Sequence, residues 1–176
     1  KEMLAAILGQ TAPVLATSGN LNNEIGVPLT LFGLNPGHRY AVIEMGAAKP
    51  GDSRYLVEIA DPDLSILTNA RAAHLEGFGS LDQVANTKGE IFVDKPGRLA
   101  VVNLDEPYSA LWQHLAGAAT VISHSVAGNS EATVRASHIE LGAGGSRFEL
   151  VIADQSHPIE LPVPGRHNVA NALAAA

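Results

Sequence analysis

The sequence predicts an α/β fold, in which a mostly parallel sheet is flanked by helices and a small antiparallel β meander lies near the C-terminus. Up to about residue 123, short apolar runs alternate with helical patterns, which is typical of parallel strands joined by helices. From about residue 130, apolar and polar residues alternate between turn signals, which indicates three short antiparallel strands over residues 130–163.

The parallel strands are expected where apolar residues run almost without interruption, as in strands buried on both faces of a sheet. They are residues 13–17, 40–45, 64–68, 99–103 and 119–123.

The helices are expected where apolar residues recur at helical spacing. Pro28 suits a first helical turn, and Asp52 and Ser80 are candidate N-caps. The expected helices are residues 1–10, 27–34, 51–60, 80–92, 107–116 and 165–176.

Composition narrows the class of protein. The chain has 176 residues, with 46% hydrophobic and 16% charged residues, as in ordinary globular domains. A net charge of -7 argues against a nucleic-acid partner, because phosphate backbones are bound by basic surfaces. No apolar run has the length of a membrane span. The chain has no cysteine, which excludes disulfides and thiolate metal sites and fits a cytoplasmic location.

Helical patterns run into both ends of the chain. We therefore expect residues 1–176 to be a single partial domain that is truncated at both ends.

Polar residues follow several predicted strands, where parallel sheets bind their ligands. They are Glu44, Asn69, Asn103 and Asp105. Glu44 is a candidate Mg²⁺ ligand, because Mg²⁺ prefers hard oxygen ligands and often uses only one or two carboxylates. The alternative role is a helix cap or an ion-pair partner.

His74 and Lys88 form a second candidate site, since the loop and helix between them can fold back on each other. His74 could ligate a metal or transfer protons, although a single histidine is more often bonded to a loop carbonyl. Lys88 could balance phosphate charge, although most helix lysines face solvent.

Two groups of asparagines are candidate binding residues, because each amide both donates and accepts hydrogen bonds. Asn20, Asn22 and Asn23 share one loop, where turn formation is an equally good explanation. Asn168 and Asn171 share one face of the last predicted helix and could contact a base edge, although Asn168 could instead cap the helix.

Four segments together resemble the central, ATP-binding domain of the Mur ligases, which are ATP-dependent amide-forming enzymes of peptidoglycan precursor synthesis. Within that family, the sequences of these segments are most similar to those of members that join D-alanyl-D-alanine to UDP-N-acetylmuramoyl-tripeptide. The segments are residues 19–31, 40–47, 73–92 and 164–176.

The resemblance implies ATP and Mg²⁺ as cofactors. It implies that Glu44 and His74 ligate Mg²⁺, and that Lys88 is carbamylated and thereby also becomes a ligand. It further implies that Asn168 and Asn171 contact adenine, and that the loop of Asn20, Asn22 and Asn23 lines the substrate cleft.

The Gly-Lys-Ser/Thr phosphate loop of the family does not occur in these 176 residues, and neither do the flanking amino- and carboxy-terminal domains. We therefore expect this chain alone to lack ligase activity. Two alternatives stay open: a related amide ligase similar to folylpolyglutamate synthase, or a non-catalytic module that binds nucleotide or precursor.

Overall fold

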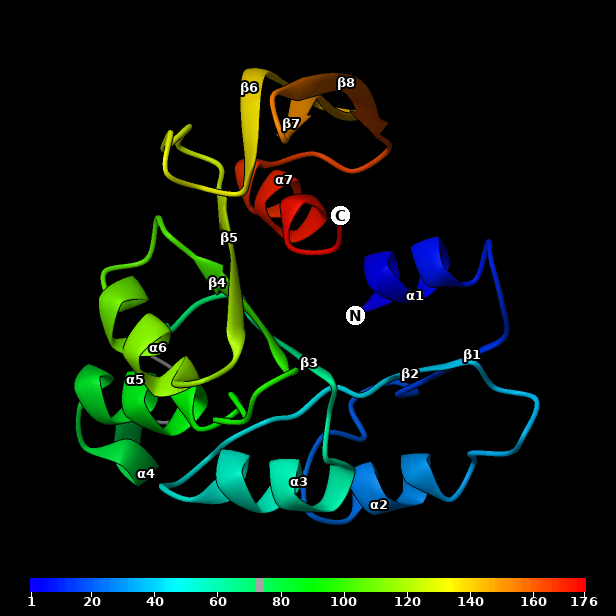
Figure 1. Cartoon of the computed structure of the whole chain (residues 1–176), viewed down its shortest axis with the longest axis vertical. Coiled ribbons are helices and arrows are strands. Elements are labelled where there is room, and N and C mark those ends of the chain that lie inside the picture. Colours follow the sequence, from blue (N-terminus) through cyan, green and yellow to red (C-terminus); the bar gives the residue numbers. More distant parts are fainter. Residues whose placement is uncertain (72–74) are drawn as a thin grey trace. The chain divides into compact units, whose positions relative to one another are not determined.

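The computed structural model describes residues 1–71 and 75–176 of the chain (Figure 1). Its residues form two compact units, the first made of Lys1–Pro62 and Ala70–Val93, and the second of Asp63–Asn69 and Asp94–Ala176.

The first unit combines helices with a two-stranded parallel sheet. Its strands are β1 (Val14–Ala16) and β2 (Tyr40–Val42), paired Val14 to Tyr40 and Ala16 to Val42. Its helices are α1 (Glu2–Leu8), α2 (Gly26–Leu31), α3 (Asp52–Ala60), α4 (Leu75–Phe78) and α5 (Leu81–Gly89). Its most deeply buried apolar side chains come from three of these helices, namely Val27, Leu56, Val84 and Ala85.

Of the two predicted helix caps in this unit, one is confirmed and one is wrong. The Ser80 hydroxyl accepts a hydrogen bond from the Gln83 N–H at 3.2 Å, so Ser80 caps α5 as expected. Asp52 is not a cap, because Gly51 holds that position with φ +88°. The Asp52 carboxylate instead accepts the N–H groups of Ala48 and Lys49, and thereby fixes the turn that precedes α3.

The second unit contains a six-stranded sheet in the order β3-β4-β5-β6-β7-β8. The strands β3 (Leu64–Leu67), β4 (Leu99–Asn103), β5 (Thr120–Ser125) and β6 (Val134–Gly142) pair in parallel, and β7 (Gly145–Ile152) and β8 (Gln155–Leu161) continue the sheet antiparallel. The predicted mixture of parallel sheet and C-terminal meander is confirmed. The strands of the meander have nine, eight and seven residues.

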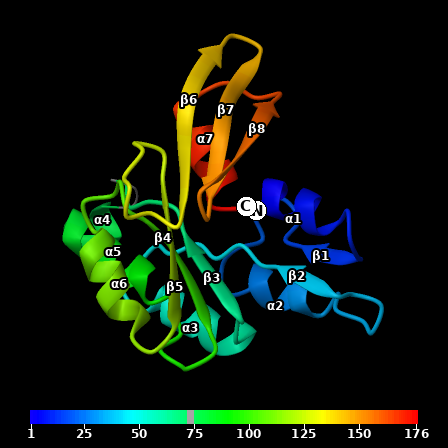
Figure 2. The same ribbon diagram turned by 45° about the horizontal axis from the view of Figure 1, so that its top comes forward.

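Helix α6 (Ser109–Ala116) contacts β4 and β5, and its Trp112 is fully buried. Helix α7 (Arg166–Leu173) packs against the meander, where Val169 and Leu173 join a cluster with Val134 and Phe148 (Figure 2). Helix α6 therefore packs on strands β4 and β5, and α7 packs on strands β5, β6 and β7.

Burial of the strands differs from the expectation of strands covered on both faces. In β4, the four residues from Ala100 to Asn103 are buried, as predicted. In β2, only Val42 is buried and Ala41 is exposed. Apolar character alone does not report which strand lies at the centre of a sheet, because a short edge strand can be equally apolar.

Candidate functional site

Glu44 lies just beyond β2, next to the end of β1. Because β1 and β2 are parallel, their carboxyl ends lie together, and the Glu44 N–H donates to the Thr17 hydroxyl at 2.9 Å. Thr17 is only 3% exposed. The backbone at Glu44 is therefore held by a buried partner from the neighbouring strand.

Two side chains hold the Glu44 carboxylate. The Asn22 amide donates to Oε1 at 2.6 Å, and the ammonium nitrogen of Lys1 lies 3.3 Å from Oε2. Asn22 is itself fixed, because its carbonyl oxygen accepts the Gly46 N–H at 2.7 Å. A Cβ on Gly46 would lie 3.0 Å from the Asn22 side chain, so glycine leaves room for this contact. The carboxylate is thus oriented before any ligand arrives.

The structure separates the three asparagines of the loop. The Asn22 amide is directed to Glu44. The Asn23 side chain accepts the N–H groups of Ile25 at 3.2 Å and Gly26 at 2.9 Å, so it shapes the start of α2. Asn20 is exposed, and its carbonyl oxygen accepts the Asn22 N–H at 2.7 Å. Asn23 therefore matches the turn alternative, and Asn20 keeps an exposed amide that a ligand could reach.

Lys88 lies in the last turn of α5, partly buried, between the buried Thr87 and Gly89. The position differs from that of an ordinary solvent-facing helix lysine. Directly after α5, Glu90 forms an ion pair with Arg54 of α3, with 3.3 Å between Oε1 and Nη2. His74, predicted as a metal ligand, lies outside the described residues.

The donor chemistry of Glu44 suits a cation. Its carboxylate oxygens are hard ligands, its side chain is 37% exposed, and the Lys1 ammonium already lies against Oε2. Among the side chains of residues 1–71 and 77–176, no group of three or more histidine or acidic side chains could hold a metal ion. Any metal held at Glu44 would therefore need ligands beyond the described histidine and acidic side chains.

In the second unit, the polar residues at the strand ends bond to each other. Asn103 donates to the Thr68 carbonyl at 3.2 Å and accepts the Asp105 N–H at 3.0 Å. The Asp105 carboxylate accepts the Ser125 hydroxyl at 2.6 Å and the N–H groups of Val126 and Ala127 at 2.6 and 3.0 Å. Asn103 and Asp105 thus connect the carboxyl ends of β3, β4 and β5.

The two asparagines of α7 differ in their surroundings. Asn168 is partly buried and donates to the Pro164 carbonyl at 2.7 Å. It is not the cap, since Gly165 holds that position. Asn171 is exposed one turn later. The beginning of α7 is tied to the loop after β5, because Arg166 donates to the Val126 carbonyl at 2.8 Å.

His124 on β5 is a polar residue that the sequence did not single out. It is 1% exposed, and neither ring nitrogen has a hydrogen-bond partner in the part of the chain that the structure describes. Burial lowers the pKa of His124 to about 4, against an opposing effect of the Asp105 carboxylate. Its signal in the sequence is a histidine that directly follows the predicted strand of residues 119–123.

The fold and the site define a class of protein. It is an α/β protein with an oriented carboxylate at the end of a parallel strand pair, and with a C-terminal helix that carries one partly buried and one exposed asparagine. The chain belongs to the Mur ligase middle domain family, whose model matches residues 1–176.

Two relatives from different bacteria have the same name. The chain is 47% identical over 178 aligned residues to the UDP-N-acetylmuramoyl-tripeptide–D-alanyl-D-alanine ligase of Escherichia coli, covering 100% of the chain and 39% of that relative. It is 35% identical to the ligase of the same name from Mycobacterium tuberculosis, covering 100% of the chain and 34% of the relative. The chain thus spans well under half of the length of these relatives.

Solved structures agree with the sequence comparison. A crystal structure of MurF from Acinetobacter baumannii superposes with a TM-score of 0.93 at 37% identity, covering 99% of this chain and 38% of that one. MurF from Thermotoga maritima in complex with ADP gives 0.86 at 27% identity, covering 99% and 40%. The G51S mutant of L. casei FPGS gives a TM-score of 0.70 at 16% identity, covering 98% of this chain and 52% of that one, which shows a shared fold alone.

In the described part of the chain, no helix is both long and apolar enough to cross a membrane.

Proposed function

We propose that this chain is the central part of an ATP-dependent ligase that joins D-alanyl-D-alanine to UDP-N-acetylmuramoyl-tripeptide. The observation that carries the proposal is 47% identity, over the whole chain, to an enzyme of that name. The TM-score of 0.93 to a MurF structure supports it independently. We also propose a cytoplasmic location, which the lack of cysteine favours.

The reaction proceeds through an acyl phosphate. The terminal carboxylate of the tripeptide attacks the γ-phosphate of ATP, which gives ADP and the acyl phosphate. The amine of D-alanyl-D-alanine then attacks the acyl carbon, and phosphate leaves as the amide bond forms. Both steps place negative charge on phosphoryl oxygens, so the enzyme must align the reactants and neutralise that charge.

Glu44 is the described residue best suited to hold Mg²⁺, which when bound would neutralise charge on the nucleotide phosphates. Its backbone and both carboxylate oxygens are held by Thr17, Asn22 and Lys1, so the ligand is oriented in advance. We assign His74 and carbamylated Lys88 to the same metal-binding function. A carbamate on Lys88 would present oxygen atoms, which suit Mg²⁺ better than an ammonium group.

The adenine of ATP is assigned to α7. Asn171 is exposed and Asn168 is partly buried on the same helix, so their amides can be offered to one base edge. The exposed amide of Asn20 is assigned to the substrate cleft.

The test is a ligation assay with the complete natural protein that contains this chain. ATP hydrolysis that requires both UDP-N-acetylmuramoyl-tripeptide and D-alanyl-D-alanine, with formation of the pentapeptide product, would support the proposal. Activity with a folate and glutamate instead would place the protein with the folylpolyglutamate synthases. Nucleotide binding without turnover of any of these substrates would indicate the non-catalytic module.

The matched variants are Glu44→Gln and Asn23→Ala. Glu44→Gln removes the charge of the proposed ligand and should lower kcat at least a hundredfold. Asn23→Ala lies in the same region but removes only the contacts that start α2, so it should leave kcat within a few-fold of the parent.

A further inference from the structure

The ammonium group of Lys1 is surrounded by oxygen atoms. It donates to the Gly19 carbonyl and lies 3.3 Å from Glu44 Oε2 and 3.6 Å from Glu2 Oε1. The Lys1 side chain is only 13% exposed, whereas that of Glu2 is 83% exposed. Water therefore screens the contact with Glu2, and Glu44 is the main counter-charge of Lys1.

The two partners of the Glu44 carboxylate differ in charge. Asn22 is a neutral donor to Oε1, so it can orient the carboxylate without opposing a metal ion. Lys1 carries a full positive charge next to Oε2, on the side where it repels any second cation. A divalent cation that binds Glu44 through Oε2 must take the place of the ammonium group.

We propose that Lys1 is an internal counter-ion of Glu44, which competes with a divalent cation for this carboxylate while Asn22 positions it. The inference rests on the proposed function, because it assumes that Glu44 is a metal ligand. It adds a role for Lys1 and a separate role for Asn22. Lys1 is a positioning and competing residue, because it acts through Glu44.

The arrangement has a physical advantage. A bare carboxylate close to nucleotide phosphates would repel them, and a neutralised carboxylate does not. The Gly19 carbonyl is a second partner of the Lys1 ammonium group. Lys1 would therefore keep a partner close to the site if a divalent cation took its place at Oε2.

Replacing Lys1 and replacing Asn22 should change the affinity for a divalent cation in opposite directions. Removing the charge of Lys1 removes the competing cation, so the affinity for a divalent ion should rise, by about tenfold for a partly screened unit charge at this distance. Removing the Asn22 amide frees the carboxylate to rotate without removing any repulsion, so affinity should fall several-fold. If Lys1 served folding alone, removing its charge would not make the protein bind a divalent cation more tightly.

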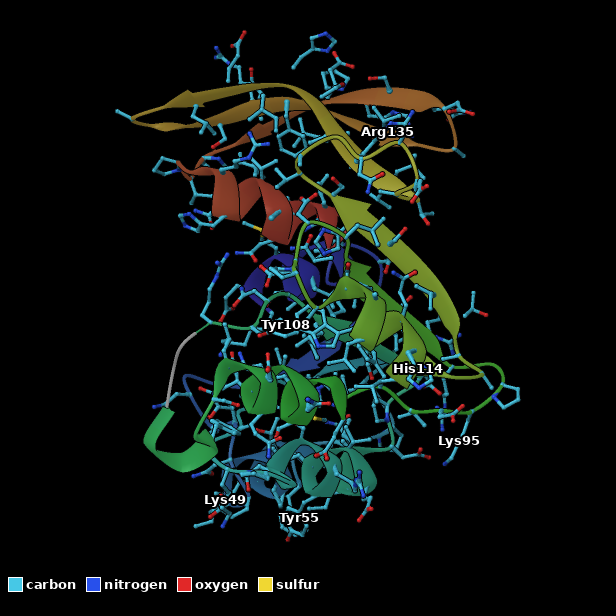
Figure 3. All side chains as sticks on the ribbon, turned by 90° about the vertical axis from the view of Figure 1, so that its left-hand side faces the viewer. Lys49, Tyr55, Lys95, Tyr108, His114 and Arg135 are labelled. Atoms are coloured by element: carbon cyan, nitrogen blue, oxygen red, sulfur yellow. The ribbon has the colours of Figure 1, made fainter. Side chains whose placement is uncertain are left out.

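The experiment measures Mn²⁺ binding by electron paramagnetic resonance in the protein that carries this chain, without nucleotide. Lys1→Met and Lys1→Gln both remove the charge, and glutamine keeps a donor for the Gly19 carbonyl if methionine impairs folding. Lys1→Arg retains the charge and should bind Mn²⁺ like the parent. Lys49→Met is the matched control, since Lys49 is an exposed lysine on the same unit, next to α3 (Figure 3).

Tighter binding in Lys1→Met or Lys1→Gln, with no change in Lys49→Met and weaker binding in Asn22→Ala, is the expected result. Unchanged or weaker binding in both neutral Lys1 variants would overturn the counter-ion role. Glu44→Gln tests the assumption separately. If Glu44→Gln binds Mn²⁺ as well as the parent does, the metal site proposed at Glu44 is wrong, whatever the Lys1 variants show.

Discussion

Acidification should destabilise the second unit through His124. Its pKa is 6.5 in an exposed setting and about 4 in the fold, so the unfolded chain binds a proton over a pH range in which the folded chain does not. Stability therefore rises with pH between these two values and is lost as the pH falls from about 6.5 toward 4. The cause is burial, because at 1% exposure and without a hydrogen-bond partner among the described residues the imidazolium is poorly solvated.

The size of the effect follows from the two pKa values. Over the whole range, a difference of about 2.5 units corresponds to about 3 kcal/mol. Between pH 7 and pH 5, the same pair of values gives a loss of about 2 kcal/mol in the free energy of unfolding. This loss is large against the total stability of a domain of this size.

The assay is urea unfolding of the parent protein and of His124→Leu at pH 7 and at pH 5. Leucine cannot be protonated, so the variant should lose about 2 kcal/mol less than the parent over this range, whatever its stability at pH 7. His114→Gln is the control, because His114 on α6 faces water (Figure 3) and its replacement should leave the pH dependence unchanged. Equal losses in the parent and in His124→Leu would refute the reasoning.

Three other predictions test the fold and the site. Gly145→Ala would place a Cβ 2.4 Å from the Leu161 carbonyl oxygen and should cost about 2 kcal/mol by urea unfolding, whereas Gly144→Ala meets no atom within 4 Å and should cost much less. Asn23→Ala removes the acceptor that starts α2 and should lower the free energy of unfolding by about 1 kcal/mol. Lys88→Ala in the protein that carries this chain should abolish the proposed amide formation even with added bicarbonate; near-normal turnover would remove Lys88 from the site.

The sequence predicted local structure well where one segment carries its own signal. The run LAVVN is apolar and β-branched, and it forms the buried strand β4. Ser80 precedes a helical pattern and caps α5 as expected. The change to alternating polarity after residue 130 marks the meander of β6, β7 and β8. These features depend on neighbours in the chain, so they can be inferred from the order of residues.

The turn between β7 and β8 shows a limit of such local inference. Ala153 and Asp154 both have positive φ, 48° and 63°, as a two-residue hairpin turn requires. Aspartate is common at positive φ, whereas alanine is not. The pairing of the two long strands therefore holds Ala153 in a conformation that alanine does not favour.

The candidate site shows the same division between features that local sequence reveals and contacts that join distant segments. From the sequence alone, Glu44 could be recognised at a strand end, and the asparagines of its loop could be recognised as polar candidates. Which asparagine meets Glu44 was open, because the contact joins residues 22 positions apart. The Lys1 ammonium, the Asn22 amide and the Thr17 hydroxyl gather around Glu44 because β1 and β2 pair in parallel.

The sequence by itself determined the family, the order of the helices and strands except for the short helix α4, and the residues that could carry the chemistry. The tertiary structure decided which of those side chains are already bonded within the chain, and it found the buried His124. The physical reason is that hydrogen bonds and burial depend on distances between segments far apart in the chain. Those distances are set by strand pairing and packing, which no single segment encodes.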